Sequence, residues 1–304
     1  MRNDGKIHAL LATARIANVP SVLSNLAVGV FLGGLASGRE FVWPGWLLVA
    51  GVLFYVSGNV LNDWADLDWD KEKRPERALP RGMFSARSYL LLSIGGFTIA
   101  TLLTALYGIG VLGVSLLLVA LILLYTFIHK KTFLSVIPMG LCRACLPVMG
   151  YLAMRESLSP FPFYPALALL IYIVALSLSA RWESMARIPP EKIRLSRGLL
   201  IASGWVAVCL PMQVNPMLGW IGLVPFGIVL GMALTRYRTP VPAHVSALLA
   251  GIPMLDWVVT LPLALTCLGH QSMSVPGYHL LIAIALPPLA LISGRWMQRI
   301  APAT

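Results

Sequence analysis

The segment Asn62-Asp63-Trp64-Ala65-Asp66-Leu67-Asp68-Trp69-Asp70 decides how the rest of the chain is interpreted. It follows an uncharged apolar run, and residues three, four, seven or eight positions apart share one face of an α-helix. Carboxylates gathered on one face repel one another unless a cation lies among them, and a hard ion such as Mg²⁺ prefers oxygen ligands. We therefore predict a Mg²⁺ site here, with ordinary solvated charges at a helix end as the alternative. The predicted ligands are Asn62, Asp63, Asp66 and Asp70, and Asp68 lies off their face.

Basic residues follow the aspartates directly, and Arg74 and Arg77 are the first arginines among them. Mg²⁺ that is bound by one or two carboxylates usually keeps waters and a substrate phosphate in its coordination shell. Arginine binds phosphate through two parallel hydrogen bonds. This order of acidic and basic residues predicts a ligand that carries phosphate.

The composition is that of an integral membrane protein, because 58% of the residues are hydrophobic and 12% are charged. The mean hydropathy is +0.80. The apolar stretches are continuous rather than alternating, which favours helices over a β-barrel. The formal net charge of +11 falls largely in loops between these stretches, so it does not indicate a nucleic-acid partner. No clear cleavage site follows the polar first residues, so we expect no cleavable signal peptide.

Ten apolar segments are expected to form helices. The last one is the weakest, because Pro287 and Pro288 interrupt it, and it either spans the membrane or lies at its interface. We therefore predict a single all-α domain, 1–304, that is a polytopic bundle of nine to ten transmembrane helices. The expected segments are 16–37, 45–62, 88–107, 110–128, 133–154, 162–180, 198–213, 216–235, 245–268 and 277–294.

Basic residues mark alternate connections between these segments. They are frequent from Lys71 to Arg87 and from Arg181 to Arg197, whereas the opposite side carries only Arg39 and Arg155. Cytoplasmic loops of membrane proteins carry an excess of Lys and Arg. We therefore expect a multi-pass protein of the inner or cell membrane, with both termini and the aspartate segment in the cytoplasm.

Two ionisable residues lie inside apolar segments, where charge is costly and commonly functional. Arg143 lies within the fifth segment and Asp256 within the ninth. Each must face the interior of the bundle. Either Arg143 binds a phosphate or another part of the substrate, or it forms a structural bridge with Asp256 or Glu183.

Further polar residues stand at the ends of the segments. Arg181 and Glu183 close the sixth segment, and Glu183 is expected either to complete the metal site or to pair with a basic neighbour. Tyr125 and Lys130 close the fourth segment, where Lys130 is either a positive-inside anchor or a phosphate contact. Asn18 opens the first segment, with a functional role as one of two alternatives. The histidines form no helical pair and no triad, so we assign them no role.

The pattern Asn62-Asp63-x-x-Asp66-x-x-x-Asp70 resembles the first aspartate-rich motif of the UbiA superfamily of intramembrane prenyltransferases. The run Arg74-Pro75-Glu76-Arg77-Ala78-Leu79-Pro80-Arg81-Gly82 resembles the RPxRPxPxG run that follows this motif. Tyr125 with Lys130 resembles the tyrosine–lysine signature after the fourth helix. The resemblance covers nearly the whole chain in segment order.

This resemblance implies an all-α bundle around a cavity within the membrane, with a polar cap on the cytoplasmic side. It also implies that Mg²⁺ binds the diphosphate of an isoprenoid donor, which ionises to an allylic cation that a hydrophobic or aromatic acceptor captures. The catalytic residues would then be Asp63, Asp66 and Asp70, which with Asn62 bind the metal. The expected substrate-binding residues are Asn18, Arg74, Arg77, Tyr125, Lys130, Arg143, Arg181, Glu183 and Asp256.

One departure from the family pattern concerns the second aspartate-rich motif, which is absent. Ser179-Ala180-Arg181-Trp182-Glu183 stands in its place, with a single carboxylate. Together with Gly140-Leu141-Cys142-Arg143, this segment looks more like the UbiA-like EboC branch found in ebo gene clusters. Two functions are therefore open. The protein is either a Mg²⁺-dependent prenyltransferase or a non-catalytic relative that binds or helps to export an isoprenoid or small aromatic metabolite.

Overall fold

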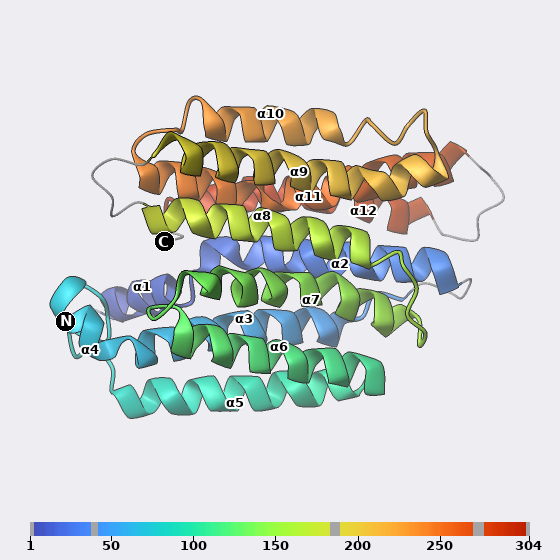
Figure 1. Cartoon of the computed structure of the whole chain (residues 1–304). Coiled ribbons are helices and arrows are strands. Elements are labelled where there is room, and N and C mark those ends of the chain that lie inside the picture. Colours follow the sequence, from blue (N-terminus) through green and yellow to red (C-terminus); the bar gives the residue numbers. More distant parts are fainter. Residues whose placement is uncertain (1–2, 38–41, 183–188, 270–276, 302–304) are drawn as a thin grey trace.

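The computed structural model describes residues 3–37, 42–182, 189–269 and 277–301, and contains helices without strands over these residues. Short helices accompany the long ones at one end of the bundle (Figure 1). The elements are α1 (Asn3–Thr13), η1 (Ile16–Asn18), α2 (Val19–Ser37), α3 (Gly45–Ala65), α4 (Leu67–Lys73), α5 (Ala86–Ala105), α6 (Ile109–Ile128), η2 (Phe133–Ser135), α7 (Val136–Met154), α8 (Phe163–Arg181), α9 (Pro190–Val214), α10 (Leu223–Leu234), α11 (Val241–Gly269) and α12 (Gly277–Met297). The predicted all-α bundle is confirmed.

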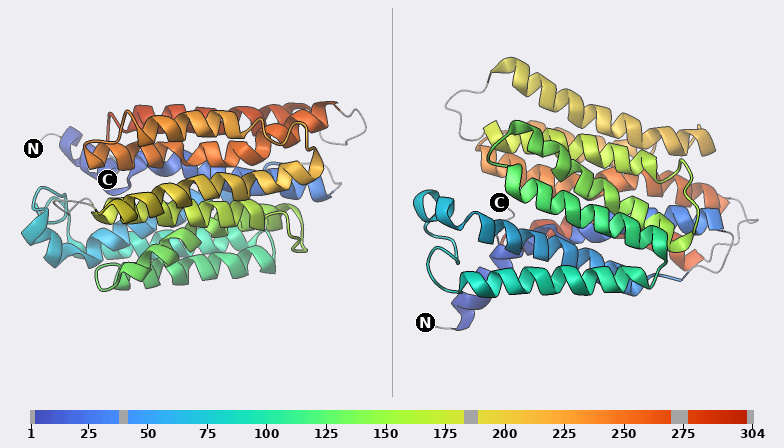
Figure 2. Two further views of the ribbon diagram at one scale, coloured as in Figure 1. Left: turned by 45° about the horizontal axis from the view of Figure 1, so that its top comes forward. Right: turned by 60° about the horizontal axis from the view of Figure 1, so that its bottom comes forward.

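The long helices run back and forth across the bundle, and successive helices point in opposite directions (Figures 1 and 2). Over the described residues, nine helices are long and apolar enough to cross a membrane. Apolar side chains such as Leu91 on α5 and Leu116 on α6 are more than half exposed, at 58% and 53%, as expected for surfaces that face lipid. The chain is therefore an integral, multi-pass membrane protein.

Two hydrophobic clusters fill the bundle and meet at α2 and α7. One joins α2, α3, α5, α6 and α7, and the other joins α2 and α7 to the helices from α8 to α12. The first and last long helices, α2 and α12, also pack together, so the bundle closes on itself. In Figure 1, α2 and α7 accordingly lie between the two groups of helices.

Glycines bring α2 and α7 into close contact. A Cβ atom on Gly29 would lie 2.0 Å from the carbonyl oxygen of Pro147, and one on Gly150 would lie 2.2 Å from that of Leu26. Small residues permit this approach, which is typical of helix pairs in membranes. The contact places the polar residues of α2 opposite those of α7.

The structure corrects the expectation about which apolar segment is weakest. The last one forms α12, a 21-residue helix, although Pro287 and Pro288 lie inside it. The segment 216–235 is the short one instead, since it forms only the 12 residues of α10 after a series of turns. Asn215 closes the first of these turns by accepting hydrogen bonds from the amides of Met217 and Leu218.

The termini and the aspartate segment share one end of the bundle. Both α1 and α4 lie at this end, and the ring of His8 is 2.7 Å from the carbonyl oxygen of Ile300 (Figure 1). This agrees with the arrangement predicted from the basic residues, in which both termini and the aspartates lie on one side. Which side is cytoplasmic remains a prediction.

Candidate functional site

Helical backbone hydrogen bonds continue through the aspartate segment, although α3 ends at Ala65 and α4 begins at Leu67. The amide of Asp66 donates to the carbonyl of Asn62 over 2.9 Å, and the amide of Asp70 donates to that of Asp66 over 2.8 Å. The predicted face is therefore continuous. Its members are buried, at 8% exposure for Asn62, 8% for Asp63, 7% for Asp66 and 1% for Asp70. Asp68 points away from them, with a side chain that is 95% exposed and paired with Lys71.

Arg77 bridges two of the buried carboxylates. Its Nη1 atom lies 2.8 Å from Asp70 Oδ2 and 3.3 Å from Asp63 Oδ1. The loop that carries Arg77 is anchored by Leu79, which is buried in a small cluster with Val60 of α3. The sequence therefore places this arginine through an apolar neighbour two residues away.

Two residues at the end of α6 contact Asp66. Lys130 Nζ lies 2.7 Å from Asp66 Oδ1 and also sits 4.0 Å above the ring of Trp69. His129 Nε2 lies 3.2 Å from Asp66 Oδ2, and His129 Nδ1 lies 2.9 Å from the carbonyl oxygen of Thr126. His129 therefore lies between this backbone carbonyl and the Asp66 carboxyl group.

The electrostatics of Asp66 follow from these neighbours. Burial raises the pKa of its carboxyl group, but the hydrogen bonds from His129 and Lys130 lower the pKa more, so that it lies below the ordinary value. Asp66 is therefore a carboxylate at neutral pH, held by two basic side chains.

Arg15, which opens the first apolar segment with Asn18 and for which a functional role and a snorkelling arginine were both open, contacts the aspartate face. It lies between α1 and η1 in the left-handed conformation, with φ 46° and ψ 50°. Its guanidinium is 3.8 Å from Asp63 Oδ1 and donates to Asn59 Oδ1 over 3.2 Å. Asn59 donates in turn to the carbonyl of Ala14. The strained backbone costs about 1–2 kcal/mol, and these polar contacts hold it in place.

His129 was missed, since the sequence analysis assigned no role to any histidine. Its ring stacks on that of Tyr125, with 5.1 Å between the centroids, and this stacking aims Nε2 at Asp66. The spacing of Tyr125 and His129, four residues apart on α6 and just before Lys130, is the signal that was available.

The donor atoms on the aspartate face fit Mg²⁺. Asn62 Oδ1 and Asp70 Oδ1 are buried oxygens that have no hydrogen-bond partner among the described residues. Orphaned oxygens of this kind are costly unless a cation or water satisfies them. Within the described ranges, no three His, Cys, Asp or Glu side chains are yet arranged around a common metal position. Arginine and lysine nitrogens neutralise the carboxylates here instead.

The remaining predicted residues are distributed around this cluster. Arg74 is exposed, and it forms no ion pair with any described residue. Asn18 is buried at the start of the bundle, where its carbonyl oxygen accepts a hydrogen bond from Ser21. Glu183 lies outside the described residues.

Arg143 and Asp256 belong to a second polar group inside the bundle. Arg143 Nη1 donates to Asn25 Oδ1 over 3.0 Å, and Asn25 Nδ2 donates to Asp256 Oδ2 over 2.8 Å. Ser24 also donates to Asp256, and Ser21 accepts from Arg143. An asparagine of α2 thus joins α7 to α11. Among the described residues, this group forms no hydrogen bond or ion pair with the aspartate face.

Arg181 contacts the connection between α6 and α7. Its guanidinium donates to the carbonyl oxygens of His129 and Thr132 and to the hydroxyl of Ser135. The partners of Arg181 among the described residues include the segment that carries Lys130, and its expected contact with substrate stays a prediction.

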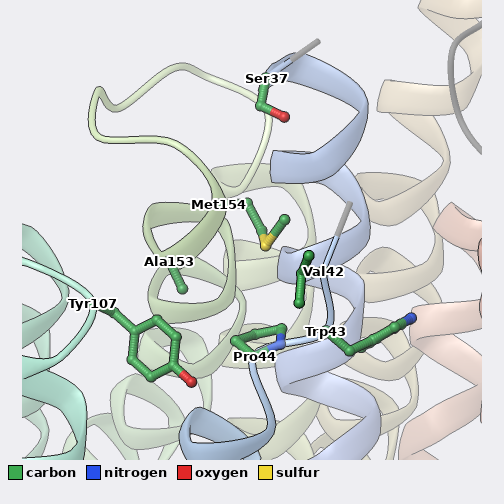
Figure 3. Close-up of a pocket in the computed structure, with 7 residues that line it drawn as sticks. All are labelled: Ser37, Val42, Trp43, Pro44, Tyr107, Ala153 and Met154. Atoms are coloured by element: carbon green, nitrogen blue, oxygen red, sulfur yellow. The ribbon is translucent and has the colours of Figure 1, made fainter. Parts of the chain in front are cut away.

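Two hollows lie away from the aspartates. Figure 3 shows a pocket of about 290 Å³ at the opposite end of the bundle, lined by residues that include Ser37, Trp43, Tyr107 and Met154. A groove of about 510 Å³ between α2 and α12 is lined by mostly apolar side chains, such as those of Leu23, Leu289 and Trp296. None of the predicted site residues that the structure describes lines either hollow.

Comparison with known proteins places these observations in a family. A model of the UbiA prenyltransferase family matches residues 26–249. A digeranylgeranylglyceryl phosphate synthase from Natronomonas pharaonis is 29% identical over 126 residues, which make up 41% of this chain and 44% of that protein. The match therefore spans less than half the length of this curated relative.

Solved structures agree with the fold. A digeranylgeranylglyceryl phosphate synthase structure gives a TM-score of 0.59 at 16% identity and covers 92% of this chain and 99% of that one. A UbiA homolog from Archaeoglobus fulgidus, bound to DMAPP and Mg²⁺, gives a TM-score of 0.51 at 13% identity and covers 94% of this chain and 98% of that one.

Proposed function

The chain belongs to the UbiA prenyltransferase family, and we propose that it catalyses Mg²⁺-dependent transfer of a prenyl group from an isoprenoid diphosphate to a hydrophobic or aromatic acceptor. The observation that carries this proposal is the buried face of Asn62, Asp63, Asp66 and Asp70. Basic side chains oppose this face from three separate parts of the chain. Such a combination suits a metal ion together with a polyanionic ligand.

In this proposal Asn62, Asp63, Asp66 and Asp70 hold the ion, and the three aspartates are the catalytic residues. Bound there, Mg²⁺ supplies the positive charge that stabilises departing pyrophosphate. Carboxylates that bind the ion no longer need the protein's own cations.

Arg77 and Lys130 are then available to pair with diphosphate oxygens, and Arg74 is exposed nearby on the same loop. Pairing of guanidinium with phosphate is charge-assisted and directional, so these residues both bind and orient the leaving group. The apolar interior excludes water from the allylic cation. Tyr125 is a proposed substrate-binding residue, because its ring stacks on that of His129 beside the aspartate face. Asn18 and Glu183 remain proposed substrate contacts.

The relatives support the donor class. The Archaeoglobus fulgidus UbiA homolog was solved with DMAPP and Mg²⁺ bound, and the curated relatives are named digeranylgeranylglyceryl phosphate synthases. The acceptor is proposed only as a hydrophobic or aromatic molecule. For Arg143 and Asp256, the hydrogen bonds through Asn25 support the structural alternative.

A second candidate function is supported by the missing second motif. Ser179-Ala180-Arg181-Trp182-Glu183 offers one carboxylate where the family pattern has several. This is the reason to propose the EboC-like branch, and it favours a relative that binds or helps to export an isoprenoid or aromatic metabolite without transferring it.

Incubation of the purified protein in nanodiscs separates the two functions. Dimethylallyl, geranyl and geranylgeranyl diphosphates are supplied with Mg²⁺ or with EDTA, together with phenolic, quinone-type and prenylglycerol acceptors. Pyrophosphate release that requires both Mg²⁺ and an acceptor supports the transferase. Mg²⁺-dependent binding without release supports the binding protein. Absence of binding to all three diphosphates contradicts the transferase, and absence of binding to the phenolic, quinone-type and prenylglycerol molecules as well contradicts both functions.

A further inference from the structure

The connection between α6 and α7 carries the two side chains that hold Asp66. It comprises residues 129–135, with Lys130 and His129 at its start. Apolar packing contributes little to its position, because Phe133 and Leu134 are 67% and 51% exposed. Its conformation therefore depends on hydrogen bonds.

Arg181 supplies hydrogen bonds at three points of this connection. It reaches from the last residue of α8 to the carbonyl oxygens of His129 and Thr132 and to the Ser135 hydroxyl. These acceptors lie at the beginning, middle and end of the connection. A guanidinium has a fixed planar arrangement of donors, so one side chain sets the shape of the whole segment.

We propose that Arg181 is a positioning residue, which holds His129 and Lys130 against the aspartate face from the opposite half of the chain. Its own guanidinium is occupied with the connection, and its effect on the site passes through these two side chains. The step from position to diphosphate affinity rests on the proposed function. The step from Arg181 to the shape of the connection does not.

Hydrogen–deuterium exchange tests the shape of the connection without any ligand. In Arg181→Leu, amides of residues 129–135 should exchange at least about tenfold faster than in the wild type, because hydrogen bonds to charged groups are the stronger kind. Arg155→Leu is the matched control. Arg155 also donates to a helix-end carbonyl, that of Ala36, but at the other end of the bundle. Unchanged exchange in Arg181→Leu would overturn the proposal.

Ser135→Ala covers the case in which Arg181→Leu does not fold. It removes one of the three acceptors and keeps the guanidinium, so a smaller increase in exchange over the same amides is expected. No increase in Ser135→Ala, when Arg181→Leu fails to fold, would count against the proposal.

Titration with geranyl diphosphate and Mg²⁺ tests whether Arg181 acts through its neighbours. Arg181→Leu should weaken binding about tenfold, and Arg181→Lys should restore part of the affinity, because an ammonium cannot match the planar fork. In a His129→Leu, Lys130→Leu background, Arg181→Leu should add less than about twofold. A full tenfold loss in that background would mean direct contact with diphosphate and would reject the positioning role.

The exchange and binding measurements together distinguish a failure of the positioning role from a failure of the proposed function. If the wild type does not bind geranyl diphosphate while exchange changes as expected, the proposed function is wrong and the positioning role stands. If binding is normal but neither exchange nor the double-variant comparison responds, the positioning role is wrong and the proposed function stands.

Discussion

At the scale of single residues, the site balances its own charges. The carboxylates of Asp63, Asp66 and Asp70 face Arg15, Arg77 and Lys130, so buried acid and base compensate each other. An uncompensated charge in the interior would be costly. A cation that binds here must therefore replace the ion pairs between the aspartates and the basic side chains, because the site is not a preformed metal site.

Asp66 and Asp68 provide a matched comparison, because they are two residues apart and differ in exposure. Asp66→Asn should weaken Mg²⁺-dependent binding of geranyl diphosphate at least about 100-fold, since it removes a charged ligand from the buried face. Asp68→Asn should change affinity by less than about twofold, because this side chain is 95% exposed. Calorimetric titration checks both. Equal losses in the two variants would contradict a helical ligand face.

Arg77 should contribute to stability when the metal is absent. Arg77→Leu leaves Asp63 and Asp70 without their bridging cation, and we expect the free energy of unfolding to fall by about 2 kcal/mol or more. Added Mg²⁺ should then raise the melting temperature more in this variant than in the wild type. Arg74→Leu is the control, because Arg74 is exposed and forms no ion pair with the described residues. A melting temperature that is insensitive to Arg77 would argue against charge balance by this residue.

The sequence predicted one face of the site, and it named Arg77 and Lys130 without showing that they lie against this face. Helical spacing is local, so the shared face of Asn62 to Asp70 follows from the residue order alone. Arg15 reaches Asp63 only because the chain breaks between α1 and α2 and α2 packs on α3. His129 follows α6 and contacts Asp66 at the end of α3, because these two helices pack side by side. Contacts between distant elements are not encoded in the spacing of either one.

At the scale of elements, the packing of the bundle interior depends on the close contact between α2 and α7. A Cβ atom added to Gly29 would lie 2.0 Å from the carbonyl oxygen of Pro147, so the backbone of α7 occupies the space of this atom. Backbone cannot move aside as a flexible side chain can. The polar network of Asn25 and Arg143 bridges the same pair of helices.

Gly29→Ala should therefore destabilise the protein by about 1–3 kcal/mol, as overpacking does. Gly113→Ala is the control within the bundle. It lies in the second turn of α6 with nothing within 4 Å of the added Cβ, and it should be neutral or stabilising by up to about 1 kcal/mol from helix propensity. Thermal unfolding in detergent measures both. Equal stability of the two variants would contradict the close approach of α2 and α7.

Arg143 and Asp256 are expected to act as a structural pair through Asn25. Arg143→Leu should lower the melting temperature, because it removes the hydrogen bond to Asn25 and the positive charge near Asp256, which is only 1% exposed. Asp256→Asn should restore much of the stability when combined with it. If Arg143→Leu instead keeps its stability and loses affinity for geranyl diphosphate, the substrate role replaces the structural one.

At the scale of the whole molecule, hydropathy predicted the number of apolar segments but not their lengths in the bundle. Proline lowered expectations for α12, yet the helix continues through Pro287 and Pro288. The short helix is α10, which begins directly after Gly222, where an added Cβ would lie 2.6 Å from the Val258 backbone of α11. A hydropathy profile does not report where one backbone must touch another.

The helix α10 is too short to cross a membrane by itself, although its segment was expected to span. Twelve residues of helix span about 18 Å, against a hydrocarbon core of about 30 Å. The turns before α10 must make up the difference. Irregular backbone is tolerated at membrane depth only where protein covers it, and the packing of Gly222 on α11 provides such cover.

Cysteine labelling tests this crossing together with the orientation of the bundle. In a background without the native cysteines, we expect Ser85→Cys, Glu191→Cys and Arg236→Cys to react from the cytoplasm, because basic residues mark this side. Met217→Cys, 90% exposed in the turns before α10, and Ser157→Cys should react only from outside. Ser196 is unsuitable for this purpose, since it is buried against Ser179. Reaction of positions 217 and 236 from one side would mean that α10 does not cross, whereas exchange of the two sides at all five positions would invert the predicted orientation and leave the crossing intact.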